Sequence, residues 1–147
     1  MDKEYIQKRV NELGKWFECF NLDGVITRMK SASNPSIWPK VKTFLPDNME
    51  GMRVLDIGCN AGLYSIECAK LGAQVVAIEK NEPYYSQALF IRDYFEDLHN
   101  KKLDITFIKE DIINLDLSSL GMFDYTLALL VLYHYGKDQY KKFFSCF

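Results

Sequence analysis

The sequence predicts an α/β fold: a Rossmann-like, doubly wound parallel sheet of about four strands, preceded by an N-terminal helical extension. Two apolar runs each carry an acid at or near their carboxyl end, Asp56 in the first and Glu79 in the second. Between these runs, a turn punctuated by Gly58 and Gly62 opens a helical pattern. Strand, glycine turn, helix, strand and terminal acid are the parts of the first βαβ unit of a nucleotide-binding α/β fold.

Length and composition fit a single globular domain. The 147 residues are 48% hydrophobic and 26% charged, which suffices for a sizeable core and argues against extensive disorder. The formal net charge is −2, so the chain lacks the strong basic footprint of a nucleic-acid-binding protein. Residues 1–42 lean positive, with eight Lys or Arg against five acids. A solvated helix face explains that excess as well as an RNA-binding face does.

Four cysteines stand at positions 19, 59, 68 and 146, without a CxxC pair or neighbouring histidines. We therefore expect no metal site and no disulfide framework, but reduced thiols in a cytoplasmic protein. The N-terminus lacks an apolar signal core, and the longest apolar run, Leu127 to Tyr133, is too short to span a bilayer. We expect no membrane partner.

Residues 1–50 are expected to form the helical extension or cap, and residues 51–147 the Rossmann-like domain. Apolar residues recur at three- and four-residue steps from Asp2 to Phe20, which predicts an amphipathic helix. A short strand or extended arm, a loop and a second helix should follow, over residues 25–27, 31–36 and 37–45.

The rest of the chain alternates between strand and helix patterns, as in a doubly wound sheet. Gly72 ends the first of these helices as a C-cap, and Asn81 begins the next as an N-cap. The expected helices cover residues 63–71 and 82–99, and a last one begins at 137. The expected strands after the first cover residues 73–79, 104–109 and 123–132, with a loop or short helix over 112–121.

The predicted last helix is still incomplete at Phe147. Phe143, Phe144 and Phe147 would form its apolar face, with no later segment to cover. We therefore expect a fragment of a longer protein that supplies the missing C-terminal part. The alternative is a natural short form that hides its open sheet edge in an oligomer.

The turn itself indicates which kind of nucleotide binds. Its pattern is Asp56-x-Gly58-x-Asn60-x-Gly62 rather than the G-x-G-x-x-G of pyrophosphate-binding turns. An acid just before the turn would repel a diphosphate, whereas it suits a ligand with an ammonium or sulfonium centre. This favours S-adenosylmethionine over a nicotinamide dinucleotide, and it disfavours a dehydrogenase.

Four segments resemble, in order and spacing, the signatures of the class I S-adenosylmethionine-dependent methyltransferases. They are residues 54–62, 76–79, 109–112 and 123–128. The resemblance covers about residues 50–140, and it implies S-adenosylmethionine as the cofactor. It also implies direct in-line displacement of the methyl group by a nucleophile of the acceptor, a reaction promoted mainly by alignment of the two reactants.

The same resemblance implies a role for each matching position. Asp56 and the backbone around Gly58 and Gly62 would hold the methionine part of the cofactor. Glu79 would accept hydrogen bonds from both ribose hydroxyls. The plainer alternatives are a helix-capping acid for Asp56 and a solvated strand-end acid for Glu79.

On the adenine side, Asp111 would take the amino group, with Glu110 and Asp116 as nearby rivals. Ile112 would pack near the ring. The other positions assigned to the cofactor are Cys59, Asn60, Lys80 and Leu130. Asn60 stands where glycine is commonest, and asparagine tolerates left-handed backbone better than most residues.

A narrower resemblance links residues 130–134, Leu-Val-Leu-Tyr-His, to the GVLYH segment of enzymes that modify the wobble uridine of bacterial tRNA. Tyr133 and His134 would lie at the carboxyl end of a central strand, where ligands bind in open α/β sheets. His134 is the candidate general base and Tyr133 the candidate positioning residue. A core aromatic and a structural histidine are the alternative.

The sequence thus predicts an S-adenosylmethionine-dependent methyltransferase with an unidentified acceptor: a small molecule, a sugar or a tRNA base. The net charge does not support the tRNA alternative. A second hypothesis from another class is a non-catalytic, cofactor-binding partner subunit of a methyltransferase.

Overall fold

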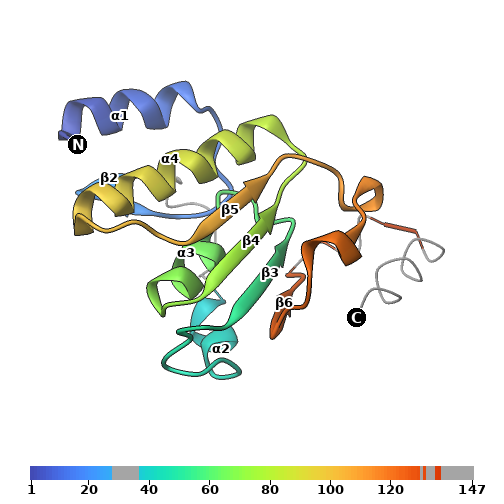
Figure 1. Ribbon diagram of the computed structural model, residues 1–147. Coiled ribbons are helices and arrows are strands. Elements are labelled where there is room, and N and C mark those ends of the chain that lie inside the picture. The colour runs from blue at the N-terminus through green and yellow to red at the C-terminus, as the bar shows by residue number, and fades with distance from the viewer. Residues whose placement is uncertain (28–36, 130, 132–134, 137–147) are drawn as a thin grey trace.

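The protein is built around a four-stranded parallel sheet with strand order β5-β4-β3-β6 (Figure 1). The computed structural model describes residues 1–27, 37–129, 131 and 135–136. Leu55 of β3 lies opposite Val76 of β4 on one side and Thr126 of β6 on the other. The strands are Arg53–Ile57 (β3), Gln74–Ile78 (β4), Ile105–Ile108 (β5) and Tyr125–Leu127 (β6).

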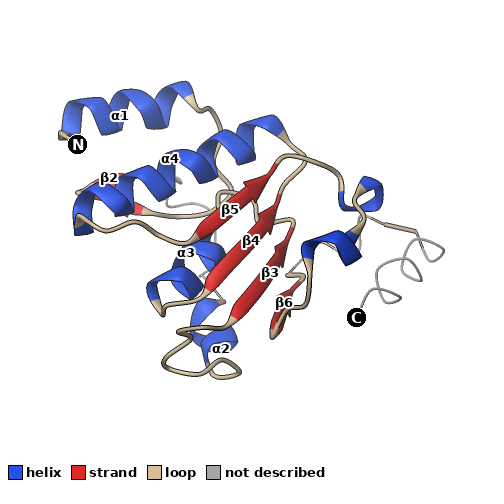
Figure 2. Cartoon of the chain, viewed as in Figure 1, coloured by secondary structure: helices blue, strands red, loops and turns tan. Residues whose placement is uncertain are grey.

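The direction of winding reverses at β3. From β3 the chain proceeds outward to β4 and β5, then returns to place β6 on the other side of β3. Two helices make the outward connections, and two short 3₁₀ turns lie on the return path (Figure 2). These elements are α3 (Leu63–Lys70), α4 (Glu82–His99), η1 (Ile112–Asn114) and η2 (Leu117–Leu120). The predicted doubly wound Rossmann-like fold is confirmed.

The N-terminal part adds a helix, a hairpin and a short second helix. The hairpin is antiparallel, with Leu22 opposite Val25. The strand at 21–22 was not expected from the sequence; of the two alternatives for 25–27, a short strand or an extended arm, the structure has the strand, over Val25–Ile26. The elements are α1 (Lys3–Glu12), β1 (Asn21–Leu22), β2 (Val25–Ile26) and α2 (Trp38–Lys42).

Each face of the sheet has its own apolar core because side chains alternate along a strand. On one face, Val54 and Val75 pack with Ile66 of α3 and Ile91 of α4, and the N-terminal Ile6 belongs to the same cluster. On the other face, the core is formed by Leu55, Ile57, Val76, Ile78, Ile112 and Leu117. Residues from the first fifty therefore share a core with the sheet; the predicted boundary at residue 50 stays a prediction.

Several predicted elements are shorter in the structure, among them the helix expected over 37–45, which is α2 over Trp38–Lys42. The first helix ends at Glu12 rather than near Phe20, because Gly14 takes a left-handed backbone with φ of 80°. The last strand, expected over 123–132, pairs over Tyr125–Leu127 among the described residues of that range, and the chain turns at Leu129. The predicted helix from residue 137 lies outside the described residues. None of the helices in the described ranges combines the length and apolarity needed to cross a bilayer.

Candidate functional site

The polar residues predicted to bind the cofactor lie at the carboxyl ends of β3, β4 and β5. These ends meet at one edge of the sheet because the strands are parallel. The strand order reverses between β3 and β6, and in open α/β sheets ligands bind in the crevice at such a switch point. The topology thus brings the predicted residues together at the expected edge.

The glycine turn after β3 has a left-handed backbone at Gly58, Asn60 and Gly62, with φ values of 69°, 52° and 85°. Successive N–H groups of Gly58 and Cys59 donate to the Ile78 carbonyl, at 2.8 and 3.0 Å. This fastens the turn to the end of β4. A Cβ atom on Gly58 would lie 2.6 Å from Cγ2 of Val131, so only glycine fits there. The pattern of the turn is therefore set by close approach as well as by conformation.

Asp56 lies inside the molecule beneath this turn, with only 2% of its surface exposed. Its Oδ2 accepts a hydrogen bond of 2.6 Å from the Ser65 hydroxyl, and the Ser65 backbone N–H also donates to the carboxyl group. Burial raises the pKa of Asp56 to about 6, and repulsion from Glu79 adds to this effect. Asp56 thus holds the first turn of α3, whose N-cap residue Gly62 has no side chain to do so.

Glu79 follows β4 and joins the glycine turn to the start of α4. Its Oε2 accepts from the Asn60 N–H at 3.0 Å, while its Oε1 accepts from the backbone N–H and side-chain amide of Asn81 at 2.8 and 3.0 Å. Only 5% of Glu79 is exposed. The solvated strand-end alternative does not fit this burial. A carboxylate offers about four acceptor positions, so three bonds leave capacity for a further donor.

Glu18 is a third acid at the turn, and the sequence analysis missed it. Its Oε2 accepts from the Leu63 N–H at 3.1 Å, at the start of α3. Burial raises the pKa of Glu18 to about 8, and repulsion from Asp56 and Glu79 raises it further. The sequence does contain a signal for this position, Gly14. It ends the N-terminal helix before residue 18, so Glu18 lies in the segment after the helix, where its side chain reaches the turn.

Cys59 lies in the turn but is only 2% exposed. Burial, together with repulsion from the neighbouring carboxylates of Asp56, Glu79 and Glu18, raises the pKa of the Cys59 thiol well above its ordinary value. A thiol held protonated is a poor nucleophile. The geometry therefore gives Cys59 a packing role within the turn.

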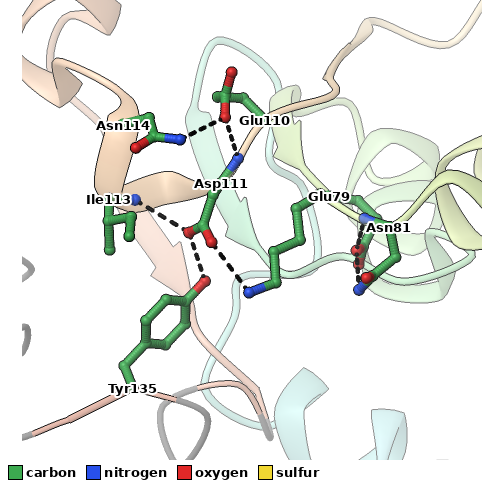
Figure 3. Close-up of polar contacts among 8 residues, drawn as sticks. Glu79, Asn81, Glu110, Asp111, Ile113, Asn114 and Tyr135 are labelled. Atoms are coloured by element: carbon green, nitrogen blue, oxygen red, sulfur yellow. Dashed lines mark hydrogen bonds and ion pairs between the residues drawn. The ribbon is translucent and has the colours of Figure 1, made fainter.

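Asp111 forms a different kind of site after β5 (Figure 3). Its Oδ2 lies 3.1 Å from the Lys80 ammonium, and its Oδ1 accepts from the Tyr135 hydroxyl at 3.0 Å and the Ile113 N–H at 3.3 Å. Partial burial opposes ionisation, but these donors outweigh it and lower the pKa of Asp111. Lys80 also lies over the Tyr135 ring, 5.2 Å from its centroid.

The two rivals of Asp111 have separate tasks. Glu110 points away from the Asp111 carboxyl group in Figure 3, and its Oε1 accepts from the Asp111 N–H and the Asn114 amide. Asp116 caps η2 through the Ser118 N–H. Only Asp111 among the three contacts Lys80, the residue that follows Glu79.

Of the four remaining residues predicted for the site, the structure describes one. Ile112 is 4% exposed and belongs to the apolar core on the second face of the sheet. Leu130, Tyr133 and His134 lie outside the described residues. The sequence did not indicate a role for the next residue, Tyr135. The structure does describe it, and its hydroxyl contacts Asp111. Within the described ranges, no cluster of three metal-ligating side chains occurs.

Comparison with known proteins identifies the family. A family model described as a methyltransferase domain matches residues 54–147. Among curated proteins, the magnesium-protoporphyrin O-methyltransferase of Rhodobacter capsulatus is 35% identical over 92 residues, 62% of this chain and 37% of that protein. The tRNA U34 carboxymethyltransferase of Azotobacter vinelandii is 31% identical over 116 residues, 78% of this chain and 34% of that protein. The chain spans about a third of the length of these two relatives.

Solved structures agree with this match. The N-terminal domain of EvdMO1 with SAH bound has the same fold, with a TM-score of 0.74 at 24% identity, over 91% of this chain and 56% of that one. The magnesium protoporphyrin IX methyltransferase of Synechocystis PCC 6803 with bound SAM gives a TM-score of 0.56 at 26% identity, over 74% of this chain and 47% of that one. The resemblance inferred from the four sequence segments is confirmed, since all four lie within the matched residues: the chain belongs to the methyltransferase-domain family.

Proposed function

We propose that this chain binds S-adenosylmethionine at the glycine turn and takes part in the transfer of its methyl group to an acceptor. The observation that carries the proposal is the pair of buried carboxylates, Asp56 and Glu79, on either side of a turn that only glycine can form at Gly58. Relatives with SAH or SAM bound share this fold, which supports the choice of cofactor.

The residues fit such a cofactor in charge and in hydrogen-bonding capacity. Asp56 and the turn at Gly58 and Gly62 would hold the methionine part, because a buried carboxylate that has no cationic partner among the described residues favours a cationic ligand. Glu79 would accept from a ribose hydroxyl with the one acceptor position that its three bonds leave; accepting from both hydroxyls, as the resemblance implies, would require one of those bonds to be given up. Asp111 would accept from the adenine amino group.

The cofactor would supply a methyl group already attached to a good leaving group, a sulfonium. The chain's own residues would then contribute orientation and exclusion of water. The turn fastened to Ile78 fixes the cofactor's position relative to the sheet edge. Alignment of this kind accounts for a large part of the barrier reduction in two-substrate reactions. A general base is needed only for an acceptor that must lose a proton, and His134, positioned with Tyr133, stays the candidate.

The acceptor class is proposed as a small molecule, a sugar or a tRNA base. Curated relatives are named for O-methylation in magnesium-protoporphyrin and ubiquinone biosynthesis, and one is named for tRNA U34. The net charge of −2 favours the small-molecule classes over tRNA. We place the protein in the cytoplasm, because Cys19, Cys59 and Cys68 are free cysteines.

Calorimetric titration with S-adenosylmethionine tests the proposal. Asp56→Asn and Glu79→Gln preserve shape while removing charge, and each should weaken binding at least tenfold. Asp93→Asn, which alters an exposed acid on α4, is the matched control and should bind like the wild type. Thermal melting of each variant checks that it is folded. Wild-type affinity in both folded site variants would overturn the assignment.

A transfer assay with methyl-labelled cofactor then separates the acceptor classes. Bulk bacterial tRNA, a catechol and a sugar nucleotide serve as the three probe acceptors. Label in tRNA alone would favour a nucleic-acid substrate despite the acidic charge. Binding without label in any acceptor would favour the non-catalytic partner subunit.

A further inference from the structure

We propose that Glu18 is a further residue of this site, and that it makes the glycine turn favour the cationic sulfonium cofactor over its neutral thioether product. The inference rests on the proposed cofactor role of the turn. It assigns a specificity-determining function to a residue that lies outside the residues matched to the methyltransferase domain.

The segment that carries Glu18 is held firmly in place. The Glu18 carbonyl accepts from the Thr27 hydroxyl at 2.9 Å, and that hydroxyl oxygen accepts in turn from the Phe20 N–H at 2.9 Å. Upstream, the Gln87 side chain on α4 donates to the carbonyls of Leu13 and Lys15, both at 3.0 Å. The carboxyl group of Glu18 is therefore directed at the turn by fixed backbone on both sides.

Among the described residues, the surroundings of this carboxyl group contain acids and no counter-charge. The titratable groups near it are Asp56 in β3, Glu79 just after β4, Cys59 in the turn and Tyr64 in α3. Over the part of the chain that the structure describes, no Lys, Arg or His forms an ion pair with Glu18, Asp56 or Glu79. Each of these three acids is at least nine-tenths buried.

Buried carboxylates without a cationic partner are costly, so a positive ligand in their midst is favoured strongly. The reaction changes the charge of the ligand: the methyl carbon leaves sulfur for the acceptor, and the electrons of the broken carbon–sulfur bond stay on sulfur. The cofactor thereby loses one positive charge. When Glu18 is ionised, a site with three acids should lose affinity for the cofactor at that step, which promotes release of the product.

A purely structural role for Glu18 predicts something different. In that case its carboxylate only satisfies the backbone N–H groups of Leu63 and Ala61 at the start of α3, and its loss would affect both forms of the cofactor equally. The ratio of the two dissociation constants therefore separates specificity from capping, whereas stability alone does not.

The test is calorimetric titration of the wild type and Glu18→Gln with S-adenosylmethionine and with S-adenosylhomocysteine. At pH 9, where Glu18 is ionised, the variant should lose about tenfold of the wild-type preference for the sulfonium form. At pH 6.5, where the raised pKa of about 8 keeps Glu18 protonated, the two proteins should agree. Glu12→Gln, an exposed acid on the same N-terminal segment, is the matched control and should leave the ratio unchanged at both pH values.

An unchanged ratio in a folded Glu18→Gln variant that binds both ligands would overturn this inference alone. Absence of binding of either ligand to the wild type would instead overturn the proposed function, and this inference with it. Should Glu18→Gln fail to fold, the wild-type ratio across pH 6.5 to 9 decides the matter. The sulfonium lowers the pKa of the amino group in its own ligand, so the ratio is first corrected for the separately measured amino-group titration of each ligand. The corrected ratio should rise as Glu18 ionises; a flat corrected ratio would contradict the proposal.

Discussion

Asp56 and Asp111 stand at the same edge of one parallel sheet, yet their carboxyl groups lie in opposite electrostatic environments. Asp56 is fully buried, near Glu79 and Glu18, and its pKa is raised to about 6. Asp111 is partly exposed and contacts Lys80 and the Tyr135 hydroxyl, and its pKa is lowered.

The difference shows that the partners of an acid, rather than its position at a strand end, decide which ligand it suits. Asp56, Glu79 and Glu18 have no counter-charge among the described residues, so this part of the sheet edge favours a cationic ligand. Asp111 already has its cation in Lys80, so it suits a neutral hydrogen-bond donor such as an aromatic amino group. One sheet edge can thus bind the two ends of a ligand that is charged at one end and neutral at the other.

The largest expected effect is on the pH dependence of stability. Glu18 has a folded-state pKa of about 8, well above its ordinary value near 4.5, so the folded protein holds a proton that the unfolded chain has lost. The contribution of Glu18 to the free energy of unfolding should fall as pH rises from about 5 to about 8, by up to roughly 1.4 kcal/mol per pH unit. Urea denaturation at pH 5, 6.5 and 8 measures this. Glu18→Gln should flatten the decline; parallel curves for the two proteins would contradict the assignment.

The next prediction tests whether the turn above Asp56 requires glycine at position 58. Gly58→Ala combines left-handed strain with a contact to Val131, and should lower the free energy of unfolding by roughly 2–4 kcal/mol. Gly14→Ala is the matched control. It has a similar φ of 80° but open space around a Cβ, so it should cost roughly 1–2 kcal/mol. Equal costs at the two glycines would show that close approach at Gly58 is unimportant.

Removing the serine hydroxyl that donates to the buried acid Asp56 should have a smaller effect on stability. Ser65→Ala deletes the 2.6 Å hydrogen bond to Asp56 and leaves that carboxyl group short of a donor. The expected cost is roughly 1.5–3 kcal/mol at pH 8, where Asp56 is ionised, and less at pH 5, where it is largely protonated. Chemical denaturation at both pH values provides the comparison. A cost independent of pH would mean that the bond does not favour the charged form.

The equivalent change at the partly exposed acid should be the smallest. Tyr135→Phe deletes the hydroxyl that donates to Asp111 at 3.0 Å, and solvent screening limits the cost to roughly 0.5–1 kcal/mol at pH 7. The pKa of Asp111 should move upward, because a donor to its ionised form is lost. Carbon NMR titration of the carboxyl group measures that shift. A cost as large as that of Ser65→Ala would contradict the difference in electrostatic environment between Asp56 and Asp111.

Local sequence patterns were enough to predict the sheet and most of its connections. The helix predicted over 82–99 matches α4, because its N-cap, proline and apolar spacing are all encoded nearby. The helix predicted to Phe20 was too long, since Gly14 interrupts it. The strand predicted to residue 132 was also too long, because an apolar run continues past the three residues that pair with β3.

The sequence by itself determined the order of elements, the glycine turn, and the acids Asp56, Glu79 and Asp111 at the strand ends. These features are encoded in short runs whose periodicity and spacing are local. Only the tertiary structure placed Glu18 against Leu63, 45 positions away, and Tyr135 against Asp111, 24 positions away. Burial and distance between such groups set their charge, and neither quantity is a property of any short stretch of sequence.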